Sequence, residues 1–220
     1  MVVINSGSPV SMPWEDQSKA ILQSWFGGQE YGNALMDILF GEVNPSGKLP
    51  TTFPKRIEDT PAFSCYPGEN SQMDYEEKLL VGHRWYERKN IKSLFPFGHG
   101  LSYTDFSYGD LEISVGDNAD VVCRFNIENI GDMDGQEVAQ CYVSYENSPS
   151  DEPIKSLQSF KKVLIEKQKK QEIEIHLNAR NFSYWDVKDK DWKIRAGSYS
   201  IEIGSSSEKI ELSETITLGN

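Results

Sequence analysis

The second half of the chain is dominated by short segments in which apolar and polar residues alternate. Alternation of this kind turns one face of a strand toward a core and the other toward solvent. Five such segments occur, at residues 111–115, 121–127, 138–143, 171–177 and 199–203, and glycine-containing turn signals at 129–132 and 196–197 punctuate them. Several short alternating strands separated by turns predict an antiparallel β-sandwich, which we place at residues 105–220.

The first half combines strand and helix patterns. Val2–Ile4 and Ala20–Phe26 are short apolar runs that predict buried strands, and a helical turn is expected between them from Pro13 to Lys19. From Gln29 onward, apolar positions 34, 35, 38 and 39 fall on one helix face, and Gly41 supplies the left-handed residue just past its end. Strand, helix, strand, helix is typical of a parallel sheet covered by helices.

Two parallel strands are too few to enclose a core, because a parallel sheet is normally buried on both faces and built from several βα units. We therefore expect residues 1–60 to be the C-terminal part of an α/β sandwich domain, and the chain to be the tail of a longer polypeptide. Residues 61–104, rich in proline, glycine and aromatic residues, are expected to form a linker that wraps across the boundary. The predicted fold class is mixed: a partial α/β segment with a parallel sheet, followed by an all-β sandwich.

The charge balance excludes several classes of partner. The chain has 34 acidic and 22 basic residues, which gives a net charge of -12. Such a surface repels nucleic-acid phosphates and anionic lipid, and no apolar run approaches the roughly 20 residues of a membrane-spanning helix. We therefore expect neither nucleic acid nor membrane as a partner. A lysine-rich stretch is interpreted as a solvated hairpin tip, with a binding patch as the alternative: Lys161, Lys162, Lys167, Lys169 and Lys170.

Cysteine and glycine patterns predict no metal and no organic cofactor. Cys65, Cys123 and Cys141 are an odd number without CxxC spacing, which indicates neither a disulfide framework nor a zinc site. Cys123 and Cys141 lie in strand-like segments, where a free thiol serves as a small core residue. Gly27-Gly28 lacks a phosphate-binding pattern and is interpreted as a tight turn. Asn181 begins a formal glycosylation sequon, which matters only in a eukaryotic secreted protein, and we predict no compartment.

Three motifs, in a fixed order, carry a family resemblance. The first runs from Gly27 to Gly41 and on through Asn44-Pro-Ser-Gly-Lys-Leu-Pro to Thr52-Phe-Pro; the second is Tyr75–Glu87; the third is Leu94–Tyr103, which contains Phe-Pro-Phe-Gly-His-Gly. In this order and spacing they resemble the C-terminal region of family 3 glycoside hydrolases of the β-glucosidase type. The sandwich that follows resembles the fibronectin type III-like domain, an immunoglobulin-like fold, that closes many of them. The resemblance covers essentially the whole chain.

The resemblance implies a retaining hydrolase of β-linked glucosides or oligosaccharides, with a barrel domain preceding the α/β sandwich. Retention of configuration requires two carboxyl groups about 5–5.5 Å apart. In the family, the nucleophilic aspartate lies on the barrel and the acid/base glutamate in a loop before the strand that corresponds to Val2–Asn5. Neither position falls in this chain, so we predict no catalytic residue here, identify no substrate-binding residue, and expect the isolated chain to be inactive. The implied partners are the glucoside, the barrel domain and, as an open alternative, a second copy in a homodimer.

Several side chains nevertheless invite a functional interpretation. Glu30, at a helix start, is interpreted as a capping residue, and Glu76 and Glu77 as part of a solvated loop, with sugar contact as the alternative. His83 is expected in a strand and His99 in an ordered turn, both without a nucleophile beside them. The tryptophans are interpreted as core residues, with sugar stacking as the alternative: Trp14, Trp25, Trp85, Trp185 and Trp192.

A second function class stays open from the sequence. The β-sandwich could serve as a non-catalytic module that binds carbohydrate or another protein. The partial α/β segment at the start argues against this alternative, because a purpose-built binding module would not need it.

Overall fold

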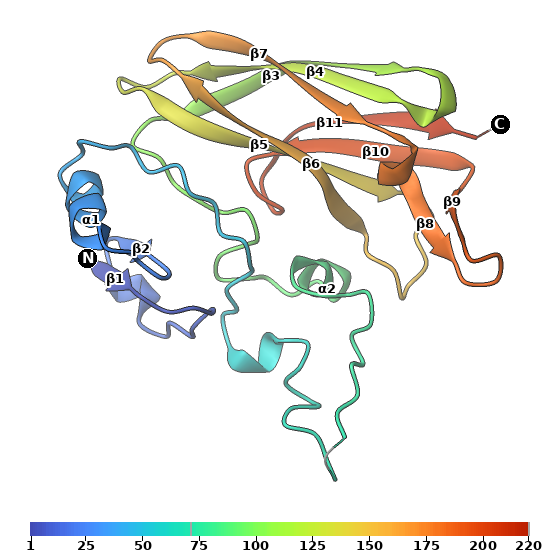
Figure 1. The fold of residues 1–220 in the computed structure, drawn as a ribbon, viewed down its shortest axis with the longest axis horizontal. Helices are drawn as coiled ribbons and strands as arrows, with labels where there is room; N and C mark the ends of the chain where they lie inside the picture. The colour runs from blue at the N-terminus through green and yellow to red at the C-terminus, as the bar shows by residue number, and fades with distance from the viewer. Residues whose placement is uncertain (71, 220) are drawn as a thin grey trace.

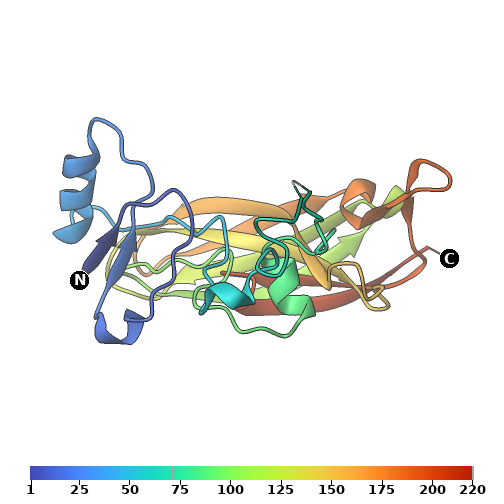
Figure 2. The same cartoon turned by 90° about the horizontal axis from the view of Figure 1, so that it is seen from below.

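The computed structural model describes residues 1–70 and 72–219 and divides them into a small α/β unit, an irregular strap and a β-sandwich (Figure 1). The α/β unit lies at one end of the elongated sandwich and the C-terminus at the other (Figure 2). In the described part of the chain, no helix is long and apolar enough to cross a membrane. The mixed fold class expected from the sequence is confirmed.

The α/β unit contains the parallel strand pair that the apolar runs predict. β1 (Val2–Ile4) pairs in parallel with β2 (Ile21–Gln23), and a short 3₁₀ turn, Glu15–Gln17, lies on the connection between them. α1 (Tyr31–Leu39) follows, and Gly41 closes it with a φ of 79°, a conformation that favours glycine. The predicted strands, turn and helix are therefore all present, and the second strand is shorter than its apolar run.

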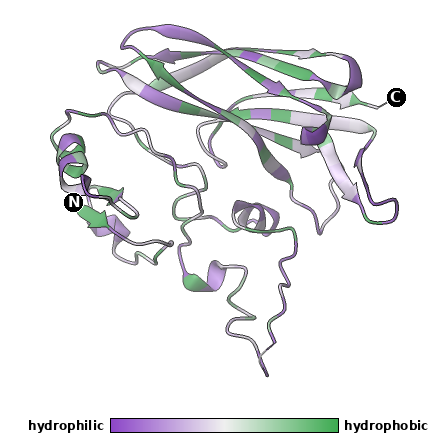
Figure 3. Ribbon diagram, viewed as in Figure 1, coloured by the Kyte–Doolittle hydropathy of each residue, from purple (hydrophilic) through white to green (hydrophobic). Residues whose placement is uncertain are grey.

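This unit buries little of its own apolar surface. α1 contains no buried residue, and Phe26 and Phe40 beside it are exposed. Figure 3 shows β1 and β2 as hydrophobic ribbons at the edge of the molecule. Within the described residues the sheet has two strands, fewer than a parallel sheet needs to enclose a core.

A strap of two antiparallel segments connects the unit to the sandwich. Phe53 pairs with Phe95, and Leu49 exchanges backbone hydrogen bonds with Gly98 and His99. Between the two segments lie a 3₁₀ turn (Ile57–Asp59), a loop that projects away from the sandwich and α2 (His83–Arg88) (Figure 1). The strand expected at His83 is therefore wrong: a six-residue helix begins there, and its last residue, Arg88, donates hydrogen bonds to the sandwich.

The sandwich consists of a four-stranded and a three-stranded antiparallel sheet, packed face to face as in immunoglobulin-like domains, with a small hairpin beside them. One sheet has the order β11-β10-β5-β6 and the other β3-β4-β7. Their bounds, with those of the hairpin β8–β9, are β3 (Phe106–Val115), β4 (Val121–Asn129), β5 (Gly135–Tyr145), β6 (Lys155–Ile165), β7 (Lys170–Leu177), β8 (Ser183–Asp186), β9 (Asp191–Ile194), β10 (Gly197–Gly204) and β11 (Ile210–Leu218).

The core lies between the two sheets and follows the alternation in the sequence. On β4 every second residue from Val121 to Asn129 is buried, and β7 and β10 contribute inward positions in the same way. Cys123 and Cys141 are free thiols that are fully buried in this core, as expected for small core residues. Figure 3 shows the resulting alternation of hydrophobic and hydrophilic residues along the strands.

Two further expectations need correction. The lysine-rich stretch does not form a hairpin tip, because β6 and β7 belong to different sheets and the turn between them crosses from one sheet to the other. The tryptophans are not core residues: Trp14, Trp25 and Trp85 are half-buried, and Trp185 and Trp192 are exposed. The last two face each other across β8–β9, with ring centroids 5.2 Å apart.

Candidate functional site

The acidic residues selected from the sequence lie apart from one another. Glu30 stands at the N-terminal end of α1, where its carboxylate accepts a hydrogen bond of 2.5 Å from Asn33. Glu76 is exposed on the projecting loop, and Glu77 beside it is half-buried. The position of Glu30 agrees with a local role in the first turn of the helix.

The two histidines have aromatic rather than nucleophilic neighbours. His83 stacks on Phe97, with ring centroids 4.7 Å apart, and its ring lies edge-on to Tyr142. Burial, with Arg84 and Lys155 nearby, lowers the pKa of His83 to about 4, so the ring is neutral at pH 7. His99 lies in the expected turn and stacks on Phe95.

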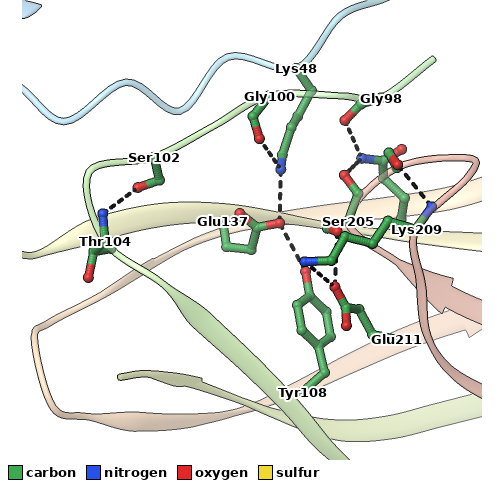
Figure 4. A network of polar contacts seen from close by, with 12 residues as sticks. Lys48, Gly98, Gly100, Ser102, Thr104, Tyr108, Glu137, Ser205, Lys209 and Glu211 are labelled. Carbon is green, nitrogen blue, oxygen red and sulfur yellow. Dashed lines mark hydrogen bonds and ion pairs between the residues drawn. The ribbon is translucent and has the colours of Figure 1, made fainter. Parts of the chain in front are cut away.

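The structure brings together a different set of polar residues, at the junction between the strap and the sandwich. Lys48 reaches from the strap to β5, where its Nζ lies 3.0 Å from Glu137 Oε1 (Figure 4). The Tyr108 hydroxyl on β3 donates to the same oxygen at 3.0 Å, and Lys48 also donates to the Gly100 carbonyl. The Lys48 and Glu137 side chains are only 13% and 6% exposed. We call this group the Glu137 clamp.

The local environment keeps the Tyr108 hydroxyl of the clamp protonated. Burial is the largest cause that raises the pKa of Tyr108 well above its ordinary value, and the charge of Glu137 adds to it. The phenol is therefore protonated at neutral pH and donates to the Glu137 carboxylate. A buried carboxylate held by an ammonium and a phenol has its charge compensated, which suits a fixed contact between segments.

Around the clamp lies a cavity of about 280 Å³ that also includes Glu208 and Glu211. Glu211 accepts hydrogen bonds or ion pairs from the Ser205 hydroxyl and from Lys209, and Glu208 accepts one from Ser93. The carboxylates of Glu137, Glu208 and Glu211 are thus each engaged by donors of this chain, and Asp105 is a fourth acidic residue in the lining. The arrangement holds the strap, β3, β5 and the β10–β11 turn together.

A second link joins the strap to the same sheet. Gln140 on β5 donates to the carbonyls of Gly98 and Ser205 and accepts from the Tyr142 hydroxyl. Gly98 has a φ of 80°, and a Cβ at this position would collide with the Gln140 side chain. Glycine is therefore required at Gly98 for both its backbone conformation and this close approach.

α2 is fastened to the sandwich by charged side chains. Arg88 donates to the Glu152 and Pro149 carbonyls and to the Ser148 hydroxyl in the β5–β6 loop. Glu87 lies 3.7 Å from Lys155 on β6, and Lys155 lies 3.2 Å from Glu202 on β10. Burial, opposed by Lys155, raises the pKa of Glu87 to about 7.

None of these junction residues was selected from the sequence, although one signal was available. Glu137 occupies the same face of β5 as Ala139 and Cys141, so a charged residue stands at an inward position of an alternating strand. Such a residue requires a buried partner. Its partner, Lys48, lies 89 positions earlier in the sequence and could not be identified without the fold.

Two family descriptions match the chain. "Glycosyl hydrolase family 3 C-terminal domain" covers residues 1–103, and "Fibronectin type III-like domain" covers residues 137–207. The second match begins within β5 and ends before β11, so the folded sandwich extends beyond it on both sides.

Curated relatives are similar over almost the whole chain. The chain is 42% identical to "Thermostable beta-glucosidase B" of Acetivibrio thermocellus, with 100% of this chain and 30% of the relative covered. It is 38% identical to "Probable beta-glucosidase I" of Aspergillus niger, with 95% of this chain and 26% of the relative covered. The chain therefore spans less than a third of the length of these relatives.

Solved structures show the same fold within larger proteins. A GH3 beta-glucosidase from Bifidobacterium adolescentis matches with a TM-score of 0.95 and 37% identity, over 99% of this chain and 32% of that protein. Beta-glucosidase 3B from Thermotoga neapolitana in complex with alpha-D-glucose matches with a TM-score of 0.93 and 36% identity, over 100% of this chain and 31% of that protein.

Proposed function

Because the chain belongs to family 3 of the glycoside hydrolases, as the C-terminal part of a β-glucosidase, we propose that it serves a retaining hydrolase of β-linked glucosides. The observation that carries the proposal is the ordered pair of family matches on one chain. Relatives and solved structures named as beta-glucosidases also align with this chain over almost all of its length. The substrate of the complete enzyme is a β-linked glucoside or oligosaccharide.

In this proposal the chain supplies scaffold and contributes no catalytic residue. The chemistry needs two carboxyl groups about 5–5.5 Å apart, one of them free to attack the anomeric carbon. The Glu137 carboxylate of the clamp and the Glu211 carboxylate in the same cavity are bound by donors of the chain itself, which supports a structural role. The catalytic pair would come from segments that correspond to the remaining length of the relatives.

We also propose three domain segments, with boundaries at 1–60, 61–104 and 105–220. The first completes an α/β sandwich domain, the second is the wrapping linker, and the third is the fibronectin type III-like sandwich. The Glu137 clamp and Arg88 support this division, because both fasten the earlier segments onto the sandwich.

The apolar surface of the α/β unit offers a place for the rest of the enzyme. Phe26 and Phe40 are 83% and 73% exposed, and Met36 and Leu39 on α1 are also exposed. Several large apolar residues exposed on one small unit are typical of an interaction surface. The occupant would be the barrel domain with the remaining α/β segments, and in the isolated chain a second copy could take its place as a homodimer.

A chimera tests the proposal. The region of the Acetivibrio relative that matches this chain over 223 residues would be replaced by this chain, and hydrolysis of an aryl β-glucoside would be measured. We expect the chimera to hydrolyse the glucoside and the isolated chain to show no turnover above buffer. The relative truncated before the exchanged region is the matched control. A chimera that folds, by its thermal transition, but is as inactive as the truncated control would contradict the proposal.

A further inference from the structure

A second cavity lies between α2 and the sandwich and has no part in the proposed hydrolysis. It has a volume of about 340 Å³, within the usual range of small-molecule pockets. Its walls come from four places: Thr52 on the strap, α2, the segment after α2, and the turn between β10 and β11, which contributes Ser207 and Glu208. Cavities at the boundary between structural units are common ligand sites.

Several polar atoms without hydrogen-bond partners belong to residues that line this cavity. The hydroxyl of Thr52, Nε2 of His83 and both carboxylate oxygens of Glu87 are buried without a hydrogen-bond partner in the described part of the chain. Thr52 is only 6% exposed, so its hydroxyl has no alternative in bulk water. An unpaired buried polar group costs about 1–3 kcal/mol, which makes four such atoms around one cavity a costly arrangement unless something pairs with them.

The lining mixes donors and acceptors of both charge signs. Glu87 and Glu208 present carboxylates, Lys92 presents an ammonium, and Asn90 an amide. Lys155, behind Glu87 at 3.7 Å, balances part of the negative charge, although it is shared with Glu202. In the described residues no group of three or more His, Cys, Asp or Glu is placed to hold a metal ion. The mixture therefore suits a neutral ligand with several hydroxyl groups better than an ion.

We propose that this cavity is a binding site for a small neutral polyhydroxylated molecule of the monosaccharide class. Each hydroxyl of such a molecule both donates and accepts, so one ligand can donate to Glu87 and accept from Thr52 or Lys92. The site goes beyond the proposed function, because it lies wholly within this chain and requires no catalytic carboxylate. Since its walls belong to both the strap and the sandwich, an occupant would also hold α2 against the sandwich.

Calorimetric titration of the isolated chain with D-glucose tests the site. We expect saturable binding with a Kd on the order of 1 mM. Thr52→Val and Glu87→Gln keep the side-chain shape but remove a hydroxyl or the negative charge, and each should weaken binding by roughly tenfold. Thr52→Ser restores the hydroxyl and should bind as the unchanged chain does. Glu172→Gln, on the exposed face of β7, is the matched control and should leave the Kd unchanged.

Three outcomes would overturn the proposal. The first is the absence of saturable heat from the unchanged chain. The second is equal affinity in the unchanged chain and in folded Thr52→Val and Glu87→Gln variants, which would place the ligand elsewhere. The third is saturation by ammonium or potassium chloride and not by glucose, which would make the cavity a cation site. The titration measures only binding to this chain. A negative result would therefore refute the binding site without contradicting the proposed function, which the chimera assay tests separately.

Discussion

At the scale of single residues, Glu87 and His83 carry opposite contributions to the pH dependence of stability. Burial raises the pKa of Glu87 from 4.5 to about 7, so between these values the folded state holds a proton that the unfolded state has released. Stability from this group therefore falls as pH rises from 4.5 to 7. The pKa of His83 is lowered from 6.5 to about 4, so the unfolded state binds the extra proton and stability falls as pH drops through that window.

Single substitutions should separate the two contributions. Each of these two pKa changes corresponds to about 3 kcal/mol, and in the unchanged chain the two contributions to stability nearly cancel between pH 4.5 and 6.5. His83→Phe should make the protein more stable as pH falls from 7 to 4.5, whereas Glu87→Gln should make it less stable over the same range. Urea denaturation at several pH values measures both slopes. Parallel slopes in the two variants would refute the assignment.

The Glu137 clamp makes a second prediction at this scale. Glu137→Gln leaves the Lys48 ammonium buried without its counter-charge, and we expect a loss of about 3 kcal/mol in the free energy of unfolding. The double variant with Lys48→Met removes both charges and should recover much of that loss. Chemical denaturation of the two single variants and the double variant gives the coupling energy. Additive losses would show that the two side chains do not depend on each other.

At the scale of elements, the sequence predicted strands where alternation is clean and failed where it is not. β4, β7 and β10 have one buried and one open face, and their patterns show it. β6 was not predicted, because it is an edge strand whose residues 160–162 and 164 are exposed, which breaks the alternation. The hairpin β8–β9 lies beside the two sheets, and its short strands show no apolar period that could be recognised.

The candidate site was predictable only in part. The sequence correctly predicts that Glu30 lies at a helix start and His99 in a turn, because the backbone conformation at both positions depends on neighbouring residues. The prediction of a strand at His83 was wrong, because a helix of six residues is too short for its apolar pattern to be distinguished from that of a strand. The clamp depends on contacts between Lys48 and Glu137, which are distant in the sequence, and no local pattern encodes such a pairing.

Docking of α2 makes a prediction at the scale of elements. Arg88 supplies several charge-assisted hydrogen bonds to the β5–β6 loop, each worth about 1.5–3 kcal/mol when buried. Arg88→Met should therefore loosen α2 and raise the rate of proteolytic cleavage between residues 83 and 92 several-fold. Arg124→Met is the matched control, since Arg124 forms a half-exposed ion pair with Glu174 on the sandwich. Equal cleavage rates in both variants would argue against a fastening role for Arg88.

At the scale of the whole molecule, the exposed apolar surface of the α/β unit should govern association. The isolated chain should self-associate or bind a hydrophobic dye through Phe26, Met36 and Phe40. Replacing Met36 by Lys and Phe40 by Glu should return the mass in sedimentation equilibrium to the 25.0 kDa of one chain. Val187→Lys, at the exposed tip of β8–β9, should not change it. A monomeric unchanged chain that binds no dye would contradict this view of the surface.

The central claim is that this chain serves a family 3 hydrolase without supplying a catalytic carboxyl group. The most direct test is kcat of the active chimera, measured with an aryl β-glucoside after Glu30→Gln, Glu76→Gln and Glu77→Gln one at a time. We expect kcat to stay within a few-fold of the unchanged chimera in all three. A loss of about 10²–10⁴-fold in any one of them, the usual effect of removing a general acid or base, would place catalytic chemistry in this chain and contradict the account.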